Sequence, residues 1–148
     1  STMTQTIIRL CSISGAGRFL MVMPDTYFFG EQPYEYLSNG TSEMDLACWK
    51  IRQEQHGKLG QVLIREIPEG AVLESRDKDP NCQWPHSWGA MGFNKSALAF
   101  ADPEMPHTGY MIPHLLEAGV NVNAKVLDGV YFDCGTPREY LQMLELLS

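Results

Sequence analysis

Two aspartates, Asp25 and Asp133, each follow a run of apolar residues that predicts a buried strand. In open α/β sheets, ligands bind outside the carboxyl ends of strands, and helix N-termini bind phosphates. Two carboxylates at such an edge suit Mg²⁺, which takes one or two carboxylates together with substrate phosphates. The pair therefore indicates a magnesium site; the alternative is that each aspartate is an ordinary cap or turn residue.

The cysteines and histidines lack the spacing of a structural metal site. The four cysteines are widely spaced without a C-x-x-C pair, and the four histidines form no H-E-x-x-H motif. We expect reduced thiols, mostly buried as small apolar side chains, in a cytoplasmic protein.

Length and charge limit the class of protein. The 148 residues fit a single domain spanning 1–148, and the net charge of −7 disfavours a nucleic-acid partner. No apolar stretch is long enough to cross a bilayer, so we expect no membrane partner either.

The alternation of helical and strand patterns predicts an α/β fold with a mixed sheet flanked by helices. Capping boxes at 2–5 and 136–139 predict an opening and a closing helix. The run Phe19–Met23 has no polar alternation, so we expect a strand buried on both faces. Other strands are expected at 44–51, 61–67, 71–74, 88–93, 120–126 and 130–132, other helices at 31–37, 94–100 and 110–118, and a loop at 75–87.

Five segments, in order along the chain, resemble the sugar-phosphate nucleotidyltransferases, the family of glucose-1-phosphate thymidylyltransferase. FLMVMPDTYFFG resembles the family's metal-binding strand, and DGVYFDCGTPREYLQM its later D-x-G-T motif. The segments between them are GQVLIREIPEGAVLESRDKDPN, SWGAMGFNKSAL and GYMIPHLLEAGVNVNAKVLDG. The resemblance is collinear from about Thr2 to Leu147 and implies an incomplete Rossmann-like nucleotidyltransferase fold.

The resemblance implies a transferase that joins a nucleoside triphosphate to a sugar 1-phosphate and releases pyrophosphate. Asp25 and Asp133 would hold Mg²⁺, which with basic side chains neutralises charge on the phosphoryl oxygens.

The resemblance also assigns the substrate-binding residues. Lys78 would face the sugar phosphate as a catalytic residue, and Asp77 would bind sugar hydroxyls. Gly89 would let the backbone approach the sugar ring closely. Arg76 would take the cationic role if the register slips by two residues. Without the family, Lys78 is interpreted as a solvated loop lysine.

The family's nucleotide site, a strand that runs into a G-x-G-T-R turn, has no counterpart here. Gly15-Ala16-Gly17-Arg18 is similar to that turn. It follows an expected helix and precedes an expected strand, whereas a phosphate cradle follows a strand and opens a helix. We therefore expect the chain to be inactive alone. The alternatives are a non-catalytic module that binds a sugar phosphate or nucleotide sugar, and an unrelated α/β protein with chance motifs.

The absence of the opening strands would leave 19–23 at the edge of the sheet. A long apolar edge favours pairing with another chain, so we expect a homodimer or larger homo-oligomer. The alternatives are that the chain is a fragment or that its first helix covers the edge.

Overall fold

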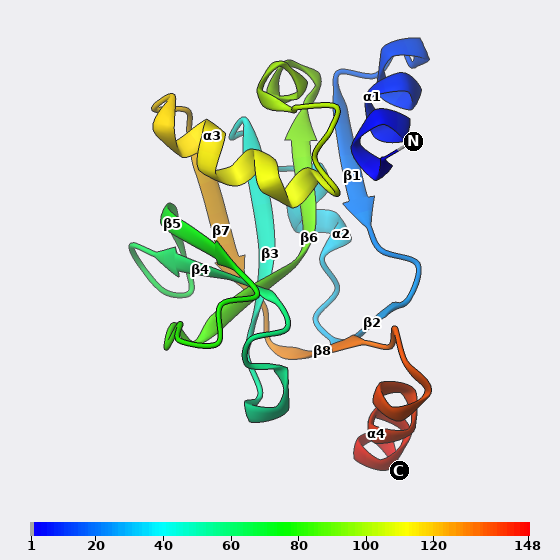
Figure 1. The fold of residues 1–148 in the computed structure, drawn as a ribbon. Coiled ribbons are helices and arrows are strands. Elements are labelled where there is room, and N and C mark those ends of the chain that lie inside the picture. Colours follow the sequence, from blue (N-terminus) through cyan, green and yellow to red (C-terminus); the bar gives the residue numbers. More distant parts are fainter. Residues whose placement is uncertain (1) are drawn as a thin grey trace.

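The computed structural model describes residues 2–148, which form eight strands, four α-helices and three short 3₁₀ segments (Figure 1). The strands are β1 (Arg18–Val22), β2 (Thr26–Gly30), β3 (Met44–Lys50), β4 (Gly60–Ile64), β5 (Glu69–Asp77), β6 (His86–Asn94), β7 (Val122–Val126) and β8 (Gly129–Asp133). The helices are α1 (Met3–Ile13), α2 (Tyr34–Ser38), α3 (Met111–Glu117) and α4 (Pro137–Leu147). The 3₁₀ segments are η1 (Gln53–Gln55), η2 (Lys95–Phe100) and η3 (Thr108–Tyr110).

The main sheet has the strand order β1-β6-β3-β7-β5-β4. It is mixed, because β3 and β7 run parallel while the other neighbours are antiparallel. The pair Gln61–Ser87 also joins β4 to β6, so the sheet curls back on itself. A second sheet pairs β2 with β8. The predicted mixed α/β architecture is confirmed.

Alternation along β3 divides its side chains between two apolar clusters. Met44, Leu46 and Cys48 contribute to the cluster on the face that α3 and η2 cover. Ala47 and Trp49 contribute to the cluster on the opposite face, where α2 and β8 lie. Burial on both faces explains why this strand is a continuous apolar run.

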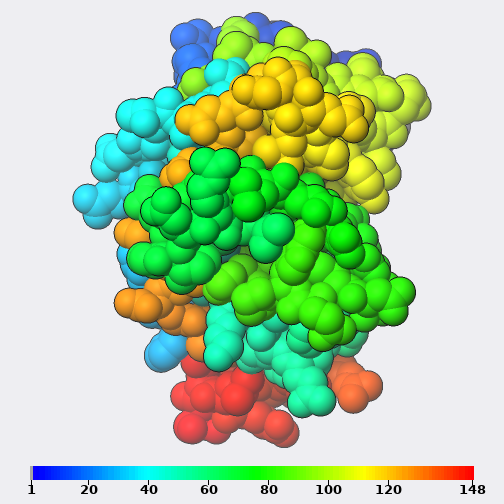
Figure 2. Space-filling model, turned by 90° about the vertical axis from the view of Figure 1, so that its left-hand side faces the viewer, coloured from blue at the N-terminus to red at the C-terminus, as the bar shows by residue number. Residues whose placement is uncertain are grey.

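Both predicted capping boxes are present. The Thr2 hydroxyl accepts from the backbone N–H of Gln5, and the Thr136 hydroxyl accepts from that of Glu139. Helix α4 lies beyond β8 at one end of the molecule, and in Figure 2 it forms the end below the β4–β5 hairpin. Met143 is its one buried residue. Among residues 2–148, no helix has the length and apolar character that crossing a bilayer requires.

Strand β1 corrects one expectation about burial. It pairs with β6 alone among the described strands, and none of its residues is fully buried. Leu20 is 39% exposed. Helix α1 contributes Ile7 and Cys11 to the cluster on one face only. The prediction that 19–23 is buried on both faces was wrong, because no described element covers the second face and the outer edge completely.

Other element boundaries also differ from the sequence patterns. Residues 75–77 extend β5 and residues 86–87 open β6, so the expected loop is shorter. The aromatics after Asp25 form strand β2, which was not predicted. The expected helix at 94–100 is a 3₁₀ segment. The Asn94 side chain does not cap it, because its Oδ1 accepts a hydrogen bond from Arg18 instead.

Candidate functional site

The two strand-end aspartates are brought together by the small sheet. Asp133 ends β8 and is paired with Thr26, the residue that directly follows Asp25. The backbone N–H of Cys134 donates to the carbonyl oxygen of Asp25 over 2.8 Å. Strand β1 ends at Val22, so Asp25 lies in the turn before β2 and not at the end of the apolar strand as expected.

The carboxylates of these aspartates converge over Gly135. A Cβ atom placed on this glycine would lie 3.2 Å from Asp25 Oδ2 and 3.4 Å from Asp133 Oδ1. The Gly135 N–H also donates to Asp133 Oδ1 over 3.3 Å. Since glycine has no side chain, the space between the two carboxylates stays open.

The electrostatics of this pair fit a cation. Burial raises the pKa of the Asp133 carboxyl, and the negative charges of Asp25 and Glu139 raise it further. Glu139 is occupied as a cap, because its Oε2 accepts from the backbone N–H and the hydroxyl of Thr136. Within residues 2–148, no three His, Cys, Asp or Glu side chains form a metal-binding group. Two carboxylates are a donor set that Mg²⁺ can use together with substrate phosphates.

A cavity of about 170 Å³ adjoins the aspartates. Asp77, Lys78, Gly89 and Asp133 all line it, although they come from distant parts of the sequence: the end of β5 and the residue after it, β6, and the end of β8. Asp25 is not part of the lining, but its carboxylate lies near Gly135 as that of Asp133 does, and its charge acts on Asp133. The fold thus gathers four of the five predicted site residues around one hollow.

Lys78 has an unusual backbone. Its φ is 50°, and it is the one non-glycine residue of the described chain with positive φ. Its backbone N–H donates to the carbonyl oxygen of Leu59 over 3.2 Å, which ties the end of β5 to the segment before β4. A side chain in this region costs about 1–2 kcal/mol, and such strain is concentrated at functional sites.

Gly89 forms part of the wall where no side chain would fit. A Cβ atom there would lie 2.5 Å from Tyr131 Cε2 and 3.0 Å from Trp49 Cζ3. The rings of Tyr131 and Trp49 stack with centroids 5.3 Å apart. Burial, followed by the charge of Asp133, raises the pKa of the Tyr131 hydroxyl. Because a Cβ atom would collide with these two rings, packing by itself requires glycine at position 89.

Arg76, the alternative cation, lines a neighbouring cavity of about 300 Å³ and is engaged by other side chains. Its Nε lies 3.3 Å from Glu74 Oε1, its Nη1 lies 3.6 Å from Asp79 Oδ2, and its guanidinium stacks 4.8 Å from the ring centroid of Trp84. It does not line the cavity beside Asp133. Of these two cations, Lys78 is therefore the one that lines the cavity beside Asp133.

Arg18, in the glycine-containing segment after α1, is held by structural contacts. Its Nη2 lies 2.5 Å from Asp45 Oδ2. Its other N–H groups donate to the carbonyl oxygens of Leu37 and Ser42 and to Asn94 Oδ1, over 2.9–3.0 Å. With these acceptors engaged, Arg18 fixes β1 to β3 and β6.

The sequence did not single out His107, Trp88 or Tyr110 as site residues. They line a second cavity of about 300 Å³, which shares Gly60, Asp77, Trp88 and His107 with the first. His107 is 30 residues from Asp77 in sequence. No motif connects the two, so only the fold reveals their proximity.

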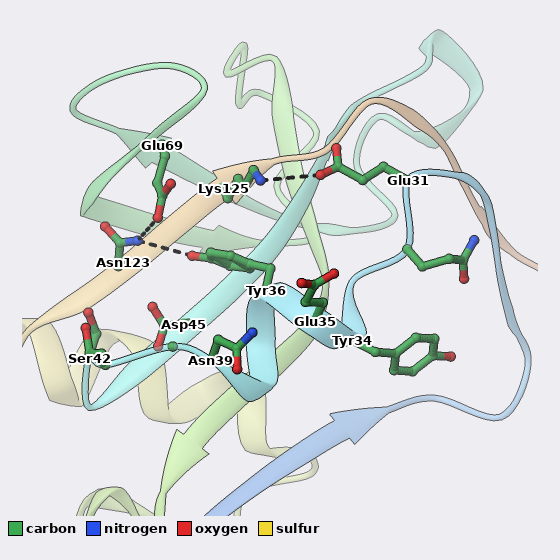
Figure 3. A pocket seen from close by; sticks show the side chains of 13 residues that line it. Glu31, Tyr34, Glu35, Tyr36, Asn39, Ser42, Asp45, Glu69, Asn123 and Lys125 are labelled. Carbon is green, nitrogen blue, oxygen red and sulfur yellow. Dashed lines mark hydrogen bonds and ion pairs between the residues drawn. The ribbon is translucent and has the colours of Figure 1, made fainter.

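A hollow of about 880 Å³, larger than both of these cavities, lies next to α2 and is lined by acidic and amide side chains (Figure 3). Its polar groups bind one another. Lys125 Nζ lies 3.3 Å from Glu31 Oε1, and Asn123 Nδ2 donates over 3.1 Å to the Tyr36 hydroxyl and to Glu69 Oε1. None of the sequence-predicted site residues lines it, so its size does not make it the candidate site.

Comparisons with known proteins give matches in structure. No family model matches the sequence, and no curated protein matches it. A glucose-1-phosphate thymidylyltransferase from Bacillus anthracis, in complex with sucrose, matches 99% of this chain with a TM-score of 0.77 and 15% identity. A UTP-bound UGPase from Acinetobacter baumannii matches 98% with a TM-score of 0.75 and 16% identity. An inositol-1-phosphate CTP transferase from T. maritima matches 93% with a TM-score of 0.73 and 13% identity.

These similarities confirm the fold expected from the sequence motifs. The chain has the architecture of sugar-phosphate nucleotidyltransferases, at identities that show the fold alone. It spans 61%, 55% and 57% of the length of these three proteins.

Proposed function

We propose that this chain is a nucleotidyltransferase-like domain that binds a sugar phosphate or nucleotide sugar together with Mg²⁺. The observation that carries the proposal is the single hollow around which Asp77, Lys78, Gly89 and Asp133 lie, with the Asp25 carboxylate beside Asp133. The nucleotidyltransferase fold of the structural neighbours supports the same proposal.

In this proposal each side chain has a separate task. Lys78 binds the phosphate of the sugar phosphate as the catalytic cation, and Asp77 accepts hydrogen bonds from sugar hydroxyls. Asp25 and Asp133 hold Mg²⁺, which when bound neutralises charge on the phosphoryl oxygens. The like-charge repulsion that raises the pKa of Asp133 is the physical reason for binding a cation there.

We also propose that residues 1–148 alone transfer no nucleotide. Among the described residues, the glycine pair at 15–17 lies between α1 and β1, whereas a triphosphate cradle lies between a strand and a helix.

The four free cysteines support a reducing compartment, and we place the domain in the cytoplasm. The free edge of β1 supports a homo-oligomer.

The test is ligand binding with metal. Hexose 1-phosphates and nucleoside diphosphate sugars, with and without Mg²⁺, are titrated into the purified protein and followed by ligand-observed NMR and thermal denaturation. Binding of at least one compound is expected, with loss in Lys78→Ala and retention in Lys50→Ala, which changes an exposed lysine at the end of β3. The Mg²⁺-dependent rise in Tm is expected to disappear in Asp133→Asn and to persist in Asp128→Asn.

Two results would contradict the proposal. If no sugar phosphate or nucleotide sugar binds under any condition, the assigned function is wrong. If the purified chain releases pyrophosphate from a nucleoside triphosphate and a sugar 1-phosphate, the expected inactivity is wrong.

A further inference from the structure

His107 and Asp77 face each other across a gap at the junction of the two cavities. His107 Nε2 lies 3.9 Å from Asp77 Oδ2, which is too long for a hydrogen bond. Both side chains are partly exposed, at 24% and 29%, and both line each cavity. A hydroxyl oxygen that lies off the line joining these two atoms can be about 2.8 Å from both, so it can accept from His107 and donate to Asp77.

The imidazole is held with its donor toward the gap. The backbone N–H of Gly109 donates to His107 Nδ1 over 3.1 Å, so Nδ1 acts as acceptor and the neutral ring carries its proton on Nε2. Burial lowers the pKa of His107 by more than the charge of Asp77 raises it, which favours this neutral form at pH 7. The pair therefore offers one N–H donor and one carboxylate acceptor.

The cavity of about 300 Å³ beside this pair leaves room for a ring-shaped ligand. Trp88 packs where Gly60 and Gly109 have no side chains, since a Cβ atom on either glycine would collide with the indole. The imidazole of His107 also lies against Tyr110, with ring centroids 4.6 Å apart. Apolar walls with a few convergent polar groups are typical of small-ligand sites.

We propose that His107 and Asp77 together bind one hydroxyl of the sugar ring and so determine which sugar the site accepts. His107 Nε2–H donates to the hydroxyl oxygen, and that hydroxyl donates to Asp77 Oδ2. Trp88 forms an apolar wall beside the ring. This inference rests on the proposed function, and it adds His107 as a specificity-determining residue. A site that hydrogen-bonds a substrate hydroxyl rejects the analogue lacking it, because its polar groups are left unpaired.

The test compares the loss of affinity caused by changing His107 with the loss caused by removing one hydroxyl from the sugar. Affinities of hexose 1-phosphates, their monodeoxy analogues, methyl hexosides and inorganic phosphate are measured for the wild type and His107→Asn. Asparagine retains a side-chain acceptor for the Gly109 N–H but does not reach Asp77. His114→Asn, at an exposed position of α3, is the matched control.

The expected result has three parts. His107→Asn weakens the best-binding hexose 1-phosphate about tenfold, as the loss of one hydrogen bond predicts. One monodeoxy analogue is weakened equally in the wild type, and His107→Asn weakens that analogue no further. Inorganic phosphate binds the wild type and both variants alike.

The outcomes separate this inference from the proposed function. Undiminished hexose 1-phosphate binding in His107→Asn, or equal further losses for every deoxy analogue, overturns the His107 assignment and leaves the proposed function standing. Binding of methyl hexosides that depends on His107, with no contribution from the phosphate, supports this inference and contradicts the proposed function. A wild-type protein that binds no sugar compound overturns both.

Discussion

Lys78 shows how a single residue connects strain with the proposed site. Its positive φ places a charged side chain next to the cavity that Asp133 also lines. Glycine adopts this backbone region without the steric cost that a Cβ atom brings. The backbone conformation favours glycine at this position, so we infer that lysine is present for the function of its charged side chain.

The variant Lys78→Gly separates these two contributions. We expect its free energy of unfolding to rise by up to about 1 kcal/mol, because the steric strain is relieved, while sugar-phosphate binding is lost. Lys78→Ala is the control, since it removes the amine and keeps the Cβ atom. Urea denaturation and ligand titration make the measurement. A less stable Lys78→Gly protein would show that the lysine is structural.

Two histidines make stability depend on pH. Burial lowers the pKa of both His86 and His107. The charge of Lys50 lowers the pKa of His86 further, whereas at His107 the charge of Asp77 offsets part of the shift and that of Lys78 adds to it. The unfolded chain therefore binds more protons than the native protein as the pH falls through the ordinary histidine pKa of about 6.5. Stability from these groups is present above this pH and is lost below it.

The double variant His86→Asn, His107→Asn tests this dependence. Between about pH 7.5 and pH 5.5, the free energy of unfolding should fall less in the double variant than in the wild type. The exposed-site variant His114→Asn should retain the wild-type slope. If the free energy of unfolding depends on pH in the same way in the wild type and the double variant, these two histidines are not the cause of the pH dependence.

At the scale of elements, β1 depends on an ion pair for its position. Strand β1 has one strand neighbour, and Arg18 adds contacts to β3, β6 and the region of α2. The side chains of Arg18 and Asp45 are 17% and 3% exposed. Burial raises the pKa of Asp45 despite the arginine, so the carboxylate depends on its partner to remain charged.

Removal of this arginine should be costly. We expect Arg18→Ala to lower the free energy of unfolding by about 3–5 kcal/mol, because Asp45 is left buried without its counter-charge. The double variant Arg18→Met, Asp45→Asn should regain much of that loss. Arg76→Ala, which removes two exposed ion pairs and the contact with Trp84, should change it by about 0–1 kcal/mol. Urea denaturation decides, and a loss in Arg18→Ala as small as that in Arg76→Ala would contradict a structural role.

For the whole molecule, two uncovered apolar regions bear on association. One is the β1 edge, where Leu20 is 39% exposed. The other is α4, where Leu141 is 59% exposed. The edge also offers unpaired backbone N–H and C=O groups, which a second strand would satisfy. We therefore place the expected dimer contact at β1.

Light scattering of three proteins at micromolar concentration tests this contact. The wild type should have the mass of a dimer, and Leu20→Lys that of a monomer, because a charged edge residue opposes strand pairing. Leu141→Lys on α4 should remain a dimer. A monomeric wild type would refute the dimer, and a monomer produced only by Leu141→Lys would move the contact to α4.

Local chemistry explains which features could be predicted from the sequence alone. The capping boxes at Thr2 and Thr136 involve residues three positions apart, so the sequence contains all of their partners. The alternation of elements predicted the mixed sheet, and the motif order predicted the fold that the structural comparisons confirm. The aspartates at 25 and 133 were recognisable because each follows an apolar run.

Only the tertiary structure decided features that depend on distant neighbours. The burial of β1 depends on what lies beside it, which no pattern within 19–23 specifies. The pairing of β2 with β8 sets the approach of Asp25 to Asp133. The fold also brings His107, the residue before η3, close to Asp77 at the end of β5. Residue types and periodicity determine local conformation, whereas register and packing between distant segments determine which side chains meet.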